Sequence, residues 1–151
     1  METARDTITI TPARPADEPA IRALLQAADL PHEDFAAHLA YFLVARQDGT
    51  VVGAVGFELH DRDALLRSLV VAPVRRGAGL GDRLVHELIT AARRACVARL
   101  YLLTTTAENF FARRGFKRIA REHVPAAVAV TPEFLSLCPA SAVCLTKDVP
   151  A

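Results

Sequence analysis

Alternation of apolar and polar residues predicts most of the strands of this chain. Residues 7–11 read TITIT, an alternating and β-branched pattern typical of a strand. Two apolar runs joined at Asp48-Gly49 predict a hairpin over residues 41–60, because this pair favours a tight turn between strands. Four later segments also have strand character: 64–73, 99–104, 116–122 and 142–148.

Apolar residues three and four positions apart predict two long helices. One covers residues 16–30, with Asp17 as its expected N-cap, and the other covers residues 79–95. Three shorter helices are expected over 32–40, over 107–116 with Gly115 at its end, and from Thr131–Pro132 onward. The predicted hairpins come first, and strand, helix, strand, helix and strand follow them along the chain. This order indicates an α/β chain of the α+β type. We expect one domain over residues 1–151, with residues 1–6 flexible.

The composition narrows the function classes. Hydrophobic residues make up 52%, charged residues 23%, and the formal net charge is +1, so nucleic acid and an anionic membrane are not expected partners. No apolar stretch is long enough to span a bilayer, and the N-terminal residues lack the pattern of a signal peptide. Cys96, Cys138 and Cys144 form no CxxC pair, which indicates reduced thiols in the cytoplasm and no metal site.

The segment VVAPVRRGAGLGDRLV, residues 70–85, contains the most specific chemistry. Its alternating glycines follow a strand and begin a helix. Backbone N–H groups at a helix start lack partners and bind anions, and glycine lets a phosphate approach them closely. Arg75 and Arg76 add positive charge. The segment therefore predicts a phosphate or pyrophosphate site, with a flexible turn before an ordinary helix as the alternative.

Two other phosphate motifs are excluded. The segment lacks the Lys-Ser/Thr of a P-loop. The dinucleotide fingerprint G-x-G-x-x-G would require glycine where Asp82 stands, and it would come too late in a chain that starts with hairpins.

Three parts of the chain together resemble the GNAT N-acetyltransferases. RRGAGLG contains Arg76-x-x-Gly79-x-Gly81, which is similar to the family's Q/R-x-x-G-x-G/A motif for the pyrophosphate of acetyl-CoA. LRSLVVAP resembles the family's fourth strand, and NFFARRGF its helix ending in F-Y-x-x-x-G-F. LLRSLVV, LYLLTTTAENFFARRGF and LCPASAVCLTKD further resemble the branch named for arsenic-resistance operons.

The resemblance implies a GNAT fold whose fourth and fifth strands, here Leu65–Ala72 and Arg99–Thr104, splay apart around the pantetheine arm. It implies an acetyl-CoA-dependent N-acetyltransferase acting on a small amine, an amino-acid-like molecule or an arsenical. Two alternatives stay open: acetylation of proteins or peptides, and a CoA-binding regulatory protein without catalysis. The second is favoured by Phe111, which stands where the family has its tyrosine acid. A homodimer is also left open.

The resemblance assigns CoA contacts to the fourth strand and the glycine segment, at Leu69, Val70, Val71, Arg75, Arg76, Gly77, Ala78, Gly79, Leu80 and Gly81. Thr104 stands where the family often has an asparagine that contacts CoA, and its hydroxyl either binds CoA or ends the strand. Asn109 is a second candidate for that contact. Phe111 is expected as an apolar wall near the sulfur.

Catalysis requires a base for the amine proton. Glu58 is the preferred candidate, because a charged residue in the apolar run GAVGFELH needs a reason. His60 and His123 come next. Ser68 is a second catalytic candidate beside the expected thioester. Arg67 either binds a carboxylate or oxyanion of the substrate or pairs with Glu58 or Asp63.

Overall fold

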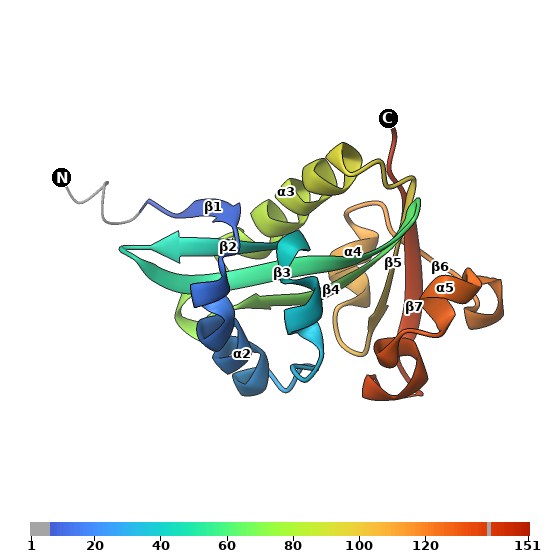
Figure 1. Ribbon diagram of the computed structural model, residues 1–151, viewed down its shortest axis with the longest axis horizontal. Coiled ribbons are helices and arrows are strands. Elements are labelled where there is room, and N and C mark those ends of the chain that lie inside the picture. The colour runs from blue at the N-terminus through green and yellow to red at the C-terminus, as the bar shows by residue number, and fades with distance from the viewer. Residues whose placement is uncertain (1–6, 139) are drawn as a thin grey trace. The chain divides into compact units, whose positions relative to one another are not determined.

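The computed structural model describes residues 7–138 and 140–151, so the segment 1–6, expected to be flexible, lies outside the described residues. Seven strands form one sheet in the order β1-β2-β3-β4-β5-β7-β6 (Figure 1). β4 and β5 pair in parallel, whereas the pairs β1–β2, β2–β3, β5–β7 and β6–β7 are antiparallel. The sheet is therefore mixed, and the predicted fold class is confirmed.

The strands are β1 (Thr9–Pro12), β2 (Phe42–Gln47), β3 (Thr50–His60), β4 (Asp63–Val71), β5 (Arg99–Thr104), β6 (Lys117–Arg118) and β7 (Val143–Asp148). The α-helices are α2 (Glu18–Ala27), α3 (Leu80–Arg94), α4 (Glu108–Ala112) and α5 (Ala126–Ala129). Shorter helical turns are η1 (Pro15–Asp17), η2 (Phe35–Tyr41), η3 (Pro73–Arg75), η4 (Arg121–His123) and η5 (Glu133–Leu137). No helix among the described residues has the length and apolar character needed to cross a membrane.

The chain divides into two compact units, of which the first comprises Met1–Phe57 and Ser68–Ala91. Its core is formed by α2, η2 and the strands β2 to β4, through Ile21, Leu25, Phe35, Phe42, Val44, Ala54 and Val70. Helix α3 packs on the opposite face. A Cβ built on Gly53, next to Ala54 in β3, would lie 3.1 Å from Leu84 Cδ1, and adjacent strand residues point to opposite faces.

The second unit comprises Glu58–Arg67 and Ala92–Ala151. Strands β5 and β7 pair over their whole length, from Arg99↔Asp148 to Thr104↔Val143. The core of this unit is a cluster of buried side chains from β4, β5, β7 and the α5 region: Leu65, Tyr101, Val124, Val128 and Cys144.

Strand β4 departs from regular pairing near its middle. Its ladder with β5 covers Asp63↔Arg99, Ala64↔Leu100 and Leu65↔Tyr101, although both strands continue. Ser68 has a φ of 62°, a left-handed conformation that interrupts the normal pleat of a strand. The separation of the fourth and fifth strands expected from the sequence therefore agrees with where this ladder ends.

Several predicted elements are altered in the structure. The segment 32–40 forms the 3₁₀ turn η2, and the strand expected over 116–122 shrinks to β6 because the chain turns into η4. Helix α5 was not predicted from its short AAVA sequence. The helix expected from Thr131–Pro132 is the π-helical turn η5, with Pro132 at its N-cap.

Candidate functional site

The glycine segment links β4 to α3 within the first unit. Gly77 and Gly79 have φ angles of 85° and 82°, a region that glycine enters without steric cost. A Cβ built on either would meet nothing within 4 Å. Glycine is therefore required here for backbone conformation, and the space beside both residues is open.

Several consecutive backbone N–H groups in this segment have no backbone carbonyl as acceptor among the described residues. Among the described residues, the N–H groups of Gly77, Ala78 and Gly79 donate to no backbone carbonyl. The first N–H groups of α3, at Leu80 and Gly81, have no acceptor inside the helix, as at every helix start. Such a group of donors, at the positive end of a 15-residue helix, can bind an anion.

Both arginines of the segment are anchored through Nε. Arg75 donates from Nε to Oε1 of Gln47, and Arg76 donates from Nε to the Val71 carbonyl oxygen at 3.1 Å. Neither of these acceptors carries a charge, so the two guanidinium groups add positive charge beside the glycines.

Side chains at the end of β4 alternate between buried and partly exposed positions. Val70 is 4% exposed and belongs to the core of the first unit. Leu69 and Val71 are partly exposed and point the other way, because side chains alternate along a strand. The expected contacts through the backbones of Leu69, Val70 and Val71 stay predictions.

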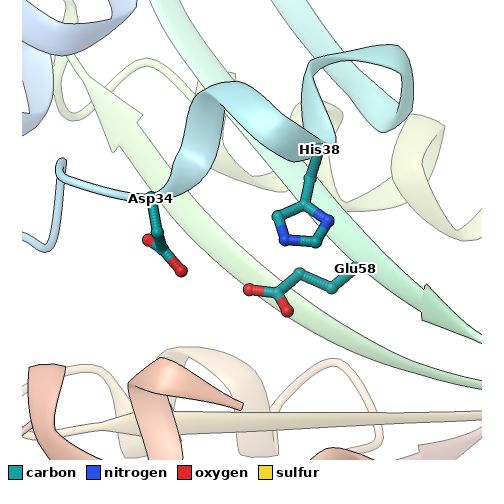
Figure 2. A group of neighbouring side chains, drawn as sticks. All are labelled: Asp34, His38 and Glu58. Carbon is teal, nitrogen blue, oxygen red and sulfur yellow. The ribbon is translucent and has the colours of Figure 1, made fainter.

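Glu58 lies near the end of β3 in the second unit and is only 1% exposed. A solvent-facing position on β3 would also have explained a charged residue in this apolar run, and the burial of Glu58 shows that explanation to be wrong. Its Oε2 lies 2.6 Å from Nη1 of Arg67, and its Oε1 lies 3.5 Å from Nε2 of His60. Figure 2 shows the Glu58 carboxylate at the end of its extended side chain, and it also shows Asp34 and His38 of the first unit, at and within η2.

Arg67 is buried between two carboxylates. Besides Glu58, its Nε lies 3.0 Å from Oε2 of Glu133 in η5, and its side chain is 0% exposed. Of the two alternatives left open for Arg67, pairing with Glu58 is the arrangement that the structure contains. The Cys138 thiol donates to Oε1 of Glu133 at 3.3 Å. Burial, together with Glu133, raises the pKa of Cys138 to about 12.

Three residues predicted to contact CoA lie around β5 and α4 in the second unit. Thr104 ends β5, and its Oγ1 accepts the backbone N–H of Ala107 at 2.9 Å, which is the strand-ending role. Asn109 is exposed on α4. Phe111 is 4% exposed and packs edge-on against Phe116, with ring centroids 5.3 Å apart. The CoA contacts predicted for all three stay predictions.

Comparison with known proteins decides the family. The family model described as "Acetyltransferase (GNAT) domain" matches residues 38–118, which is more than half of the chain. This chain belongs to the GNAT acetyltransferase family. Its mixed seven-stranded sheet flanked by helices is the GNAT fold.

Among curated relatives, the amino-acid acetyltransferase of Ralstonia nicotianae is 32% identical over 89 residues, 58% of this chain and 20% of that protein. The amino-acid acetyltransferase of Neisseria meningitidis serogroup A is 28% identical over 127 residues, 78% of this chain and 29% of that protein. The chain thus spans less than a third of the length of these two relatives.

Two solved structures share the GNAT fold over nearly the whole chain. N-acetylglutamate synthase from Neisseria gonorrhoeae, solved with coenzyme A and N-acetyl-glutamate, has a TM-score of 0.85 at 23% identity, covering 96% of this chain and 36% of that one. Rv2747 from Mycobacterium tuberculosis, solved with CoA and a second ligand, has a TM-score of 0.81 at 25% identity, covering 94% of this chain and 99% of that one.

Sequence reasoning missed two residues beside the predicted ones. Gln47 ends β2, next to the predicted turn, and gave no signal of its contact with Arg75. Glu133 carries a charge inside an apolar segment, the same signal that selected Glu58, and it is 6% exposed. The rule applied to Glu58 would have found it.

Proposed function

We propose that this protein is an acetyl-CoA-dependent N-acetyltransferase that acts on a small amine of the amino-acid type. The observation that carries the proposal is the glycine segment, where open backbone donors and two arginines follow β4. Pyrophosphate is an anion of the charge and size that such donors bind. The relatives named as amino-acid acetyltransferases support the substrate class.

In this proposal the pyrophosphate of acetyl-CoA lies on the segment from Arg75 to Gly81. The backbones of Leu69 and Val71 hydrogen-bond the pantetheine amides, as the resemblance implies. Residues Thr104, Asn109 and Phe111 complete the CoA contacts. Residues 1–151 then act as one acetyltransferase domain.

The reaction needs a neutral amine that attacks the thioester carbonyl while CoA leaves as a thiolate. Glu58 is the proposed base for the amine proton, and Ser68 lies at the irregular point of β4 beside the expected thioester. Glu58 shares the Arg67 guanidinium with Glu133. Phe111 cannot protonate the leaving thiolate, so water takes that role.

We also propose a narrower class of acceptor substrate. The segments that resemble the arsenic-operon branch support an amino acid with an arsenic-containing side chain as a candidate acceptor.

Three free thiols, at Cys96, Cys138 and Cys144, support a reducing compartment such as the cytoplasm.

The test measures CoA release from acetyl-CoA with three acceptor classes: amino acids, arsenic-containing amino acids and peptides with free N-termini. We expect turnover with a member of the first two classes. Glu58→Gln should lower kcat by about 100-fold or more, the typical share of a general base, while the Kd for acetyl-CoA stays unchanged. Glu122→Gln, at an exposed glutamate of the same unit, is the control.

Each contrary result would reject a different part of the proposal: the substrate class, the catalytic activity or the identity of the base. Turnover with peptides alone would replace the substrate class. Binding of acetyl-CoA without turnover of any acceptor would favour the regulatory alternative, and Phe111→Tyr would then be the variant to examine for restored activity. Robust turnover that ignores Glu58→Gln would remove Glu58 as the base, with His60 and His123 next.

A further inference from the structure

Gln47 is a buried polar residue that neither the GNAT motif nor the proposed mechanism uses. It is the last residue of β2 and is 9% exposed. Its Oε1 accepts the Nε hydrogen of Arg75 in η3. A buried amide at the end of a strand thus fixes one of the two arginines beside the glycine segment.

Strand β3 contains a bulge just before its pairing with the end of β2. The register between β2 and β3 pairs Ala45 with Gly53 and then Arg46 with Val51, so Val52 is the extra residue. The Val52 carbonyl accepts the N–H of Ala72 at 2.8 Å, which attaches the end of β4 to this bulge. Turn η3 follows directly, and bulges typically redirect side chains in this way.

Arg46 and Gln47 are neighbours at the end of β2, and each takes part in a contact that involves an arginine. Only the contact of Arg46 neutralises the arginine's charge. Arg46 donates from Nη1 and Nη2 to the Asp17 carboxylate, at 2.8 and 2.5 Å. That ion pair neutralises Arg46 and serves the fold. Arg75 instead meets the amide of Gln47, an acceptor with no charge. Its side chain is held in place while its positive charge is retained.

The bond from Nε to Gln47 leaves the terminal nitrogens of Arg75 as donors for a phosphate. A guanidinium binds phosphate in a bidentate manner through two parallel N–H groups, which its terminal nitrogens can supply. Nε is taken by Gln47, and within the described part of the chain the contact recorded for Nη1 is a long one of 3.5 Å to the Val74 carbonyl oxygen.

We propose that Gln47 is a positioning residue for the cofactor: its neutral amide orients Arg75, and Arg75 binds a phosphate group of CoA. This inference rests on the proposed function, because it needs CoA as the ligand. Arg75 lies one residue before the motif position Arg76, so the contact is specific to this chain's β2 end and η3 rather than to the motif.

The experiment compares two substitutions that separate anchoring from charge. Gln47→Met keeps the length and removes the acceptor, whereas Gln47→Glu keeps an acceptor and neutralises Arg75. We expect the Kd for CoA, measured by calorimetry, to rise about threefold to tenfold in Gln47→Met, the range of one ordinary hydrogen bond. In Gln47→Glu we expect a rise of about tenfold or more, the range of one hydrogen bond to a charged group. Gln26→Glu, the same change at an exposed residue of α2, should leave the Kd unchanged.

A ligand without phosphate distinguishes positioning from a merely structural role. Pantetheine, followed by NMR titration, should bind the wild type and both Gln47 variants equally. In an Arg75→Ala background, Gln47→Met and Gln47→Glu should no longer change the Kd for CoA, because the residue through which they act is gone.

Three results would overturn the inference. They are an unchanged Kd for CoA in Gln47→Glu, an equal loss of pantetheine binding, or a full effect of Gln47→Glu in the Arg75→Ala background. A wild type that binds no CoA at all would instead reject the proposed function, and this inference with it. If Gln47→Met fails to fold, Gln47→Glu still decides, because it preserves the hydrogen bond.

Discussion

Arg67 shows how one buried residue can have two opposite interpretations. From the sequence, an arginine in an apolar strand suits both a substrate carboxylate and an internal partner. The structure places its guanidinium against Glu58 and Glu133. A cation already facing two carboxylates offers little net attraction to a third. The substrate role predicted for Arg67 is therefore the weaker of the two, and stability measurements can test it.

We predict that Arg67→Met lowers the free energy of unfolding by about 3–5 kcal/mol, the usual cost of removing one partner from a buried ion pair. The loss arises because two buried carboxylates lose their shared cation. Arg67→Lys should lose less, since it keeps the charge without the planar fork. Urea unfolding followed by circular dichroism measures both.

Arg113→Met is the control for that series, because Arg113 is exposed and should change the free energy of unfolding by less than about 0.5 kcal/mol. An Arg67→Met variant as stable as the wild type, with a KM raised only for acceptors that carry a carboxylate, would return Arg67 to the substrate site.

At the scale of elements, the start of α2 differs in detail from its prediction. Asp17 occupies the N-cap position, but its side chain makes no capping bond to the helix. Its carboxylate instead accepts the Arg14 N–H at 2.8 Å and two N–H groups of Arg46 in β2. The residue thus joins the first helix to the sheet, a contact that sequence spacing could not reveal.

This ion pair should make stability depend on pH. The hydrogen bond from Arg46 lowers the pKa of Asp17 below its ordinary value. A lowered pKa in the folded state stabilises the fold fully above the unfolded value of about 3.9 and loses that effect as the pH falls through the folded value. Asp17→Asn should therefore cost about 3 kcal/mol near pH 7, and the cost should shrink as the pH falls below about 4.

Denaturant unfolding at several pH values between 2 and 7, compared with the wild type, measures this change. Asp148→Asn is the matched control, since Asp148 pairs with Arg99 at the surface, with side chains 77% and 51% exposed. Exposed pairs contribute less than about 1 kcal/mol. A cost for Asp17→Asn that stays constant from pH 7 to pH 2 would contradict the proposed cause.

Elements with local signals were predictable, whereas contacts between distant segments were not. The hairpin turn at Asp48-Gly49, the helix α3 and the left-handed Gly115 follow from residues within one turn of each other, and the structure has all three. Ser68 adopts a positive φ that serine does not signal. The partners Gln47–Arg75 and Arg67–Glu133 lie far apart in the sequence, and no periodicity encodes their contacts.

At the scale of the whole molecule, the two compact units raise the question of whether the chain unfolds in one step. The divisions fall between Phe57 and Glu58 in β3, between Arg67 and Ser68 in β4, and between Ala91 and Ala92 in α3. All three lie inside regular elements. Independent domains are normally joined by exposed linkers instead. We therefore expect residues 1–151 to unfold as one cooperative domain.

If the chain unfolds as one unit, acetyl-CoA should stabilise all of it at once. A ligand at 100 times its Kd stabilises the folded state by about 2.7 kcal/mol, which for a chain of this size is roughly 5 to 10 °C in Tm. Scanning calorimetry should show a single transition, moved as a whole by acetyl-CoA. Gly79→Val should abolish that shift, because the φ of 82° at Gly79 strains a β-branched residue and distorts the phosphate site.

Gly49→Val is the matched control, since Gly49 has a φ of 79° and equally open surroundings in the hairpin turn. It should lower Tm through the same backbone strain and yet keep the full shift with acetyl-CoA. Two separate transitions would disprove the single domain, and a Gly79→Val variant that keeps the shift would remove the glycine segment from the cofactor site.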